Sequence, residues 1–397
     1  MLVSEDEMIS LLKDAKSVLL IEPKYKHKYI PLGLAKIAGF LKLKKIPFSF
    51  AREYSGQKVN LVCVASVFTY DEDKVLDTIK GIRFLNSSVK ILIGGIYASM
   101  MTQRLENLLI KLGINNFYIF KNYSKILDMT KPYYGIDYDV EEPWSEFSAV
   151  FTARGCPNTC FYCAVPHLEK DAWINPVWQD ILTDNQKYIM ISDNNLTYYD
   201  RKHVINVLKF LEQSNKKILF NNGVDPKYVD DEIASLLGKL KWFSSGLKTS
   251  FDRLEEDGLF QDSIQKLIKY GVKKSAITAF VLFNFIDMPH EADYRMRECI
   301  NLGIRPYPQA FSPLNQTSRK NAFVGKYWTK NLVSAFRYFW LMAGFNQKMV
   351  FDDFIKSSNN RTKLNMQDIA AWENRDKNTT FKITNSLDKK KPQLLKV

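Results

Sequence analysis

Apolar runs of four to six residues alternate with amphipathic stretches over residues 1–125. The runs have the length of buried strands, and between them apolar residues recur every three or four positions, which is typical of helices. We predict strands at residues 17–21, 48–51, 61–66, 90–93 and 116–120, and helices at 32–43, 75–85 and 105–112. This alternation favours a doubly wound, Rossmann-like α/β domain, in which ligands bind at the carboxyl ends of the strands.

The regular pattern is interrupted at residues 126–146, where the sequences Lys-Pro-Tyr-Tyr-Gly and Glu-Glu-Pro-Trp predict a linker. It resumes at residue 147, with strands predicted at 148–154, 188–192, 217–221, 242–246, 275–283 and 306–311. Because helical stretches separate these strands, residues 147–315 are predicted to form a partial (β/α)6 barrel. Residues 316–397 lose the alternation and are predicted to be a mainly helical C-terminal extension.

The net charge of +13 is concentrated in this C-terminal extension. Residues 316–397 contain sixteen Lys and Arg against six Asp and Glu, including the lysine run at 389–391. Such a surplus attracts anionic partners such as RNA, although a solvated Lys-rich tail is the commoner explanation. A nucleic-acid partner therefore stays open without being favoured.

Two features indicate a cytoplasmic protein with no membrane partner. No apolar run reaches the roughly eighteen residues that a membrane span needs. The first residues are acidic where a secretory signal would be basic.

Three of the five cysteines, Cys156, Cys160 and Cys163, fall within eight residues and directly follow a predicted strand. Three thiolates can bind three irons of a 4Fe-4S cubane and leave the fourth iron open to another ligand. A zinc site of three cysteines and His167 is the alternative reading. Cys63 and Cys299 lie in apolar or helical stretches and are predicted to be small buried hydrophobic residues.

The segment from Arg154-Gly155-Cys156 to Cys163, with an aromatic residue at Tyr162, resembles the signature of the radical S-adenosylmethionine (SAM) superfamily. The resemblance implies a 4Fe-4S cluster whose open iron binds SAM, and reductive cleavage of SAM to a 5′-deoxyadenosyl radical. It also implies an electron donor such as flavodoxin or ferredoxin, and a substrate that the sequence does not identify. No catalytic side chain is assigned.

The same resemblance extends over about 147–314 and suggests residues that contact SAM. Besides Tyr162 these are Ser192 and Asp193 after the second predicted strand, Asn222 after the third, and Lys248 after the fourth. Ser192 and Asp193 would hold the methionyl amine, and Lys248 would pair with the methionyl carboxylate. Loop caps and exposed polar turns are the equally weighted alternative for these positions.

The N-terminal domain resembles the cobalamin-binding domain found in a large subgroup of this superfamily. Ala65-Ser66-Val67-Phe68 and Gly94-Gly95 are placed to wrap a nucleotide tail, but the Asp-x-His-x-x-Gly element is absent, and His27 has neighbours that do not match it. A cobalamin-dependent methyltransferase is therefore one alternative, and without cobalamin the reaction would be an epimerisation or another rearrangement. An RNA-modifying enzyme and a non-catalytic iron–sulfur protein are the others. Methylthiolation is not expected, because Cys63 alone cannot build the second cluster of methylthiotransferases.

Overall fold

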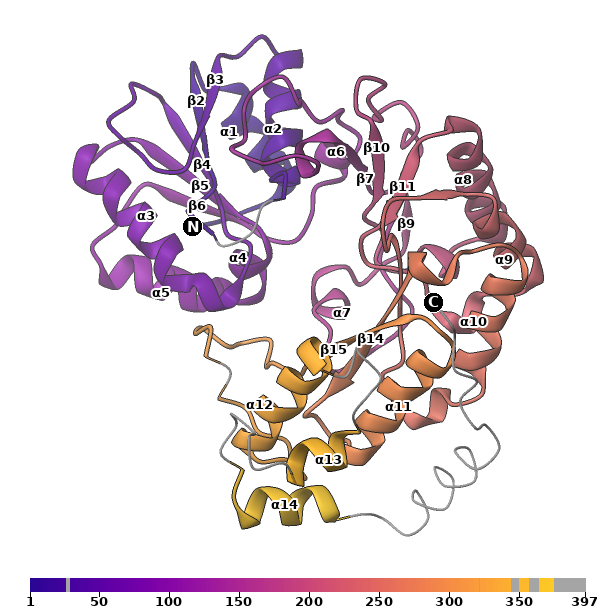
Figure 1. The fold of residues 1–397 in the computed structure, drawn as a ribbon. Coiled ribbons are helices and arrows are strands. Elements are labelled where there is room, and N and C mark those ends of the chain that lie inside the picture. Colours follow the sequence, from indigo (N-terminus) through magenta and orange to yellow (C-terminus); the bar gives the residue numbers. More distant parts are fainter. Residues whose placement is uncertain (26–28, 321, 344–349, 357–363, 375–397) are drawn as a thin grey trace. The chain divides into compact units, whose positions relative to one another are not determined.

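Six parallel strands form the first sheet of the computed structural model, in the order β1-β6-β5-β4-β2-β3 (Figure 1). The strands are β1 (Leu2–Val3), β2 (Val18–Ile21), β3 (Phe48–Ala51), β4 (Leu61–Ala65), β5 (Lys90–Gly94) and β6 (Phe117–Phe120). The last five confirm the strands predicted from apolar runs. The strand order reverses between β2 and β4, as in flavodoxin-like folds, so a ligand crevice is expected at their carboxyl ends.

The structure describes residues 1–25, 29–320, 322–343, 350–356 and 364–374. His27 and the lysine run at 389–391 lie outside the described residues. The chain divides into two compact units, which are described separately below. The first is Met1–Asn194 with Pro313–Asn321, and the second is Asn195–Ser312 with Ala322–Val397.

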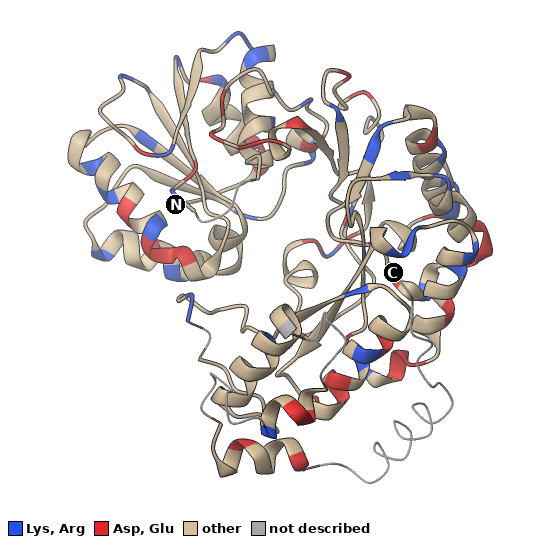
Figure 2. Cartoon of the chain, viewed as in Figure 1, with Lys and Arg blue, Asp and Glu red and all other residues tan. Residues whose placement is uncertain are grey.

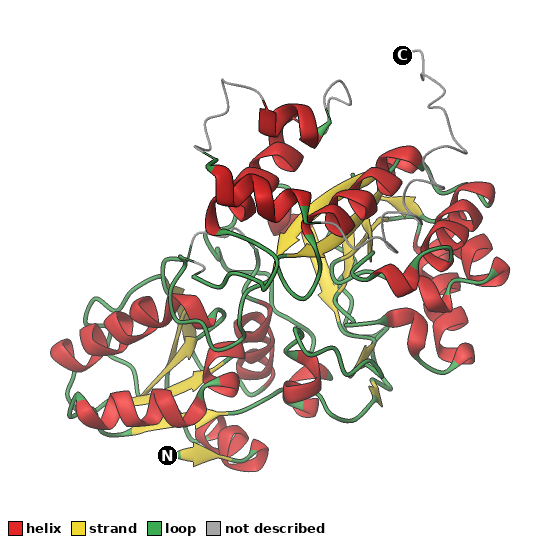
Figure 3. Cartoon of the chain, turned by 90° about the horizontal axis from the view of Figure 1, so that it is seen from below, coloured by secondary structure: helices red, strands yellow, loops and turns green. Residues whose placement is uncertain are grey.

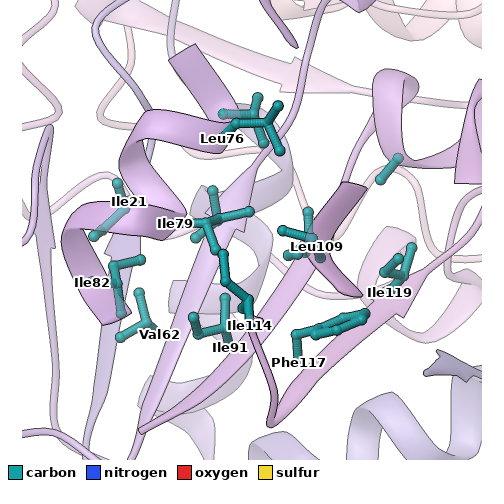
Figure 4. Packing of buried hydrophobic residues seen from close by; sticks show 14 of the residues in the cluster. Ile21, Val62, Leu76, Ile79, Ile82, Ile91, Leu109, Ile114, Phe117 and Ile119 are labelled. Carbon is teal, nitrogen blue, oxygen red and sulfur yellow. The ribbon is translucent and has the colours of Figure 1, made fainter. Parts of the chain in front are cut away.

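Helices cover both faces of the first sheet (Figures 1 and 3). The helices are α1 (Glu5–Lys13), α2 (Leu32–Leu43), α3 (Glu72–Leu85), α4 (Ile96–Met100) and α5 (Thr102–Lys111). On one face, Leu76, Ile79 and Ile82 of α3 join Leu109 of α5 in a buried apolar cluster with strand residues (Figure 4). On the other face, α1 and α2 bury their own apolar stripes against the sheet. Burial of apolar area on both faces is what stabilises this layer arrangement.

Lys90 is the only Lys, Arg, Asp or Glu residue in the six strands. The charged residues of this unit lie instead on helices and loops (Figure 2). One charged contact in this unit joins distant parts of the sequence. Arg319 Nε and Nη2 donate to the two carboxylate oxygens of the buried Asp71, at 2.8 and 2.5 Å. Arg319 therefore belongs to the first unit, although it follows strands of the second unit in the sequence.

The first unit also contains the start of the second predicted region. Strands β7 (Phe147–Val150) and β10 (Tyr188–Ile191) pair in parallel, and β8 (Ala153–Arg154) pairs antiparallel with β9 (Trp173–Ile174). The short helix α6 (Lys125–Asp128) precedes β7, and the short helix α7 (Val165–Leu168) follows the cysteines. The segment predicted as a linker includes the end of α6 and the fully packed Tyr138.

In the second unit, β13 (Leu247–Ser250), β14 (Ile277–Phe283) and β15 (Arg305–Ala310) form a parallel sheet, and β11 (Lys217–Phe220) pairs in parallel with β12 (Lys241–Trp242). The helices are α8 (Arg201–Ser214), α9 (Asp231–Gly238), α10 (Leu259–Lys269) and α11 (Pro289–Asn301), followed by α12 (Lys330–Tyr338), α13 (Phe351–Lys356) and α14 (Met366–Glu373). Phe283 of β14 contacts Trp328 and Phe336, so α12 shares a core with the sheet.

The α/β class with parallel strands is confirmed, but the fourth predicted strand of the second region was wrong. Residues 242–246 were predicted as this strand, whereas β12 ends at Trp242 and the longer strand is Leu247–Ser250. Closure of the strands into a partial (β/α)6 barrel stays a prediction, because β7 and β10 belong to one unit and β11 to β15 to the other. Among the described residues, no helix combines the length and apolar character required to cross a membrane.

Candidate iron–sulfur site

The cysteine loop leaves the carboxyl side of β7 through the short ribbon of β8 and β9. Ala153 pairs with Ile174 and Arg154 pairs with Trp173, so the two ends of the loop are held together at its base. The three cysteines lie on the loop between these strands. This position matches the expectation that they follow the end of a parallel strand, which is where α/β enzymes of the barrel type keep their chemistry.

Gly155 fixes the direction of the chain just before Cys156. Its φ of +93° lies in the left-handed region that favours glycine, and a Cβ there would stand 2.9 Å from the Asp171 carbonyl oxygen. Its N–H donates to Glu169 Oε2 at 2.9 Å. A side chain at this position would displace the backbone that follows the last cysteine. This explains why a glycine stands between Arg154 and Cys156.

The three thiols share one partly exposed neighbourhood. Cys156, Cys160 and Cys163 are each intermediate in burial, and the Cys163 N–H donates to the Cys160 carbonyl oxygen at 3.0 Å in a tight turn. Burial raises the pKa of the Cys163 thiol, and the nearby Cys160, Cys156 and Glu169 raise it further. The three thiols thus lie on one short loop, which suits a shared cluster, whose irons would bind them as thiolates.

Within the described residues, no group of three or more Cys, His, Asp or Glu side chains is placed so that it could hold a metal ion. In a cubane each cysteine binds a different iron, so the thiolates stand farther apart than around one ion. A donor set of three cysteines on one loop fits three irons of such a cluster. The other two cysteines, Cys63 and Cys299, are fully buried, and burial raises the pKa of the Cys63 thiol to about 12.

Glu169 is a site residue that sequence reasoning missed. Its carboxylate accepts from Arg154 Nη1 at 2.8 Å and from Asn194 Nδ2 at 2.6 Å, in addition to Gly155. It therefore joins the residues before the first cysteine to the end of β10. Its place six residues after Cys163 gave no signal in the sequence.

Asp193 lies at the end of β10, as predicted, and its oxygens are engaged by the chain itself. The backbone N–H of Thr152 donates to Oδ1 at 2.6 Å and the Thr152 hydroxyl donates to Oδ2 at 2.5 Å. Ser192 beside it is also buried, with its N–H bonded to the Val150 carbonyl oxygen at 2.8 Å. Asp193 thus ties β10 to the residues that lead from β7 into the cysteine loop. Contact of either side chain with SAM stays a prediction.

Burial raises the pKa of Asp193 to about 7, against the lowering effect of its Thr152 bonds. The folded protein therefore holds a proton there between about pH 4 and 7 that the unfolded chain has released. Its contribution to stability is fully present below about pH 4 and is lost as the pH rises through about 7.

We expect Asp193→Asn to remove this slope, which is up to about 1.4 kcal/mol per pH unit. Urea unfolding at pH 4.5, 6 and 8 gives the free energy of unfolding of both proteins. The stability of the variant relative to the native chain should increase as the pH rises. Glu22, whose pKa burial also raises to about 7, keeps its own slope in both proteins. Parallel stability profiles for the two proteins would contradict the expectation.

The remaining predicted residues are divided between the units. Tyr162 is partly buried on the cysteine loop, whereas Asn222 and Lys248 belong to the second unit, where Asn222 is exposed. Lys248 is not beyond the end of its strand as predicted, because it is the second residue of β13. Its ammonium donates back to the Ser245 carbonyl oxygen at 2.5 Å, and burial and the charge of Arg305 lower its pKa.

The glycine turn after β5, predicted to wrap a nucleotide tail, has an internal packing role. A Cβ on Gly95 would stand 2.5 Å from the Ser66 carbonyl oxygen, and the Ser66 hydroxyl donates to Gly94 O at 2.9 Å. At the expected crevice, the Tyr25 hydroxyl donates to the Ala65 carbonyl oxygen at 2.8 Å and so lies over the end of β4. These residues give no independent support for cobalamin, which stays a prediction.

Comparison with known proteins adds little. No known protein family and no curated protein matches the chain. Among solved structures, part of it is similar to coproporphyrinogen III oxidase (HemN) from Escherichia coli, which is described as a radical SAM enzyme. The TM-score is 0.31, with 11% identity over 41% of this chain and 40% of that chain. The functional argument therefore rests on the residues of the site.

Proposed function

We propose that this chain is a radical SAM enzyme, which cleaves SAM with one electron from a 4Fe-4S cluster and uses the 5′-deoxyadenosyl radical to take hydrogen from a substrate. The observation that carries the proposal is the loop of Cys156, Cys160 and Cys163 at the carboxyl side of β7. A set of three thiols leaves one iron open, which a structural or electron-transfer cluster with four protein ligands does not.

In this reaction the protein's own residues would hold the cluster and orient SAM and the substrate. The three cysteines would bind the irons, while Gly155 and Glu169 fix the start of their loop. When bound, the cluster supplies the electron that cleaves the sulfonium bond of SAM. Tyr162, Ser192, Asp193, Asn222 and Lys248 are proposed as residues around SAM, on the family resemblance alone.

The finer assignments are also proposals: a cytoplasmic location, a flavodoxin or ferredoxin as electron donor, and the partial barrel of residues 147–315. Methyl transfer with cobalamin and RNA modification remain alternatives for the outcome of the reaction. Corrinoid retained by protein purified after expression with cobalamin would favour the first. Salt-sensitive RNA binding would favour the second.

The decisive experiment is anaerobic reconstitution with iron and sulfide, followed by dithionite reduction in the presence of SAM. We expect about four irons per chain and the release of 5′-deoxyadenosine, measured by chromatography with mass spectrometry. Omission of dithionite is the control, because the cleavage needs one electron. A cluster that assembles without releasing 5′-deoxyadenosine would support the alternative of a non-catalytic iron–sulfur protein, and a chain that binds no iron would sink the proposal.

A further inference from the structure

Four charged side chains form a connected buried group beside the cysteine loop. Lys36 Nζ lies 2.5 Å from Asp128 Oδ1, and Arg154 donates to Asp128 through Nε at 2.7 Å and Nη2 at 3.0 Å. Arg154 Nη1 then reaches Glu169 Oε1 at 2.8 Å. We call Lys36, Asp128, Arg154 and Glu169 the charge quartet. Counted at formal charges, it contains two cations and two carboxylates and sums to zero; burial lowers the pKa of the Lys36 ammonium, while the charge of Asp128 raises it.

The charge quartet is well shielded from water. The exposed fractions of the side chains are 4% for Lys36, 3% for Asp128, 12% for Arg154 and 10% for Glu169. The ring of Phe151 lies against both cations, with its centroid 3.3 Å from Arg154 Cζ and 4.9 Å from Lys36 Nζ. Buried charges are screened little by salt, so any imbalance among the four would act on neighbouring groups.

The charge quartet connects the predicted N-terminal domain to both sides of the cysteine loop. Lys36 lies on α2, which packs on the first sheet, and Asp128 ends α6. Arg154 comes two residues before Cys156, and Glu169 comes six residues after Cys163 and accepts from the Gly155 N–H.

We infer that the charge quartet sets the reduction potential of the cluster by keeping its immediate surroundings neutral, with Lys36 as a positioning residue supplied by the N-terminal domain. The inference rests on the proposed function. Net charge and hydrogen bonds near a cluster are among the factors that determine its potential, and residues that support the ligands tune the metal. An added negative charge favours the oxidised cluster and an added positive charge favours the reduced cluster.

The test uses two variants of opposite sign in the reconstituted full-length protein. Lys36→Met leaves the quartet with one excess negative charge, and Glu169→Gln leaves one excess positive charge. We expect the first to lower and the second to raise the midpoint potential, each by about tenfold in the reduction equilibrium, or about 59 mV for one electron. The measurement is a redox titration followed by electron paramagnetic resonance of the reduced cluster.

Two neutral variants and one remote variant make the controls. The double variant Lys36→Met/Glu169→Gln and the single variant Lys36→Arg keep the quartet neutral and should stay near the native potential. Lys42→Met removes an exposed lysine from the same helix and should also leave the potential unchanged. Should a single variant lose the cluster, both neutral variants must keep it.

Shifts in the same direction, or no shift, would overturn the inference and leave the proposed function intact, because damage to the fold alone does not reverse sign with charge. Loss of the cluster in both neutral variants would overturn it as well. A native chain that assembles no cluster would instead remove the proposed function, and the inference with it.

Discussion

Cys160→Ala should abolish iron-dependent SAM cleavage while leaving the protein folded. The thiol is partly exposed on a loop, so its loss costs little packing, but it removes one of three ligands from the proposed cluster. Loss of a residue that merely supports a metal ligand costs about 10–100-fold in affinity or activity, so loss of a ligand should cost at least about a hundredfold. Iron content, the visible absorption of the cluster and 5′-deoxyadenosine release measure the effect.

Cys299→Ala is the matched control, since it removes a thiol by the same substitution. Cys299 is fully buried on α11, and burial raises the pKa of its thiol, so it is suited neither to exchange nor to binding a metal. We expect this variant to keep native iron content and SAM cleavage. Equal losses in the two variants would mean that the cysteine loop has no special role.

Asp128→Ala should lower the free energy of unfolding by about 3–5 kcal/mol, the range found when one partner of a buried ion pair is removed. The substitution would leave the ammonium of Lys36 buried without its carboxylate and would take two hydrogen bonds from Arg154. Lys36 and Arg154 outweigh the effect of burial and lower the pKa of Asp128, so the carboxylate is charged at neutral pH. Urea unfolding at pH 7 gives the value.

Asp77→Ala provides the comparison for this stability prediction. Asp77 lies on α3, pairs with Lys80 at 3.2 Å and is 72% exposed, so the pair is surrounded by water. Exposed pairs of this kind contribute little, and a change of about 0.5 kcal/mol or less is expected. A similar loss of stability in both variants would show that the burial of Asp128 has no energetic consequence.

Most strands of the fold could be predicted because they are buried on both sides and therefore consist of continuous apolar runs. The strand β13 could not, because its sequence Leu-Lys-Thr-Ser is half polar. Leu247 and Thr249 are buried, whereas Lys248 and Ser250 are only partly buried. The strand was predicted too early, at residues 242–246, where Trp242 and Phe243 are aromatic. β1 is only two residues long and gave no periodic signal.

The cysteine loop could be predicted because its ligands are close together in the sequence. The charge quartet could not be predicted in this way. Lys36 and Asp128 are 92 residues apart, and only the fold brings them together. The same reason explains Glu169, whose role depends on the return of the chain through β9. Lys248 was assigned to the end of a strand because the strand itself had been placed too early.

The bond between Asp71 and Arg319 has a consequence for how the protein is made. The two residues are 248 positions apart, so the ribosome completes Asp71 long before its partner. At about 5–20 residues per second the delay is roughly 12–50 s. During this interval Asp71 has no Arg319 to bind, because Arg319 has not yet been translated. A messenger RNA truncated before the codon for Arg319 would yield a chain that never forms this ion pair.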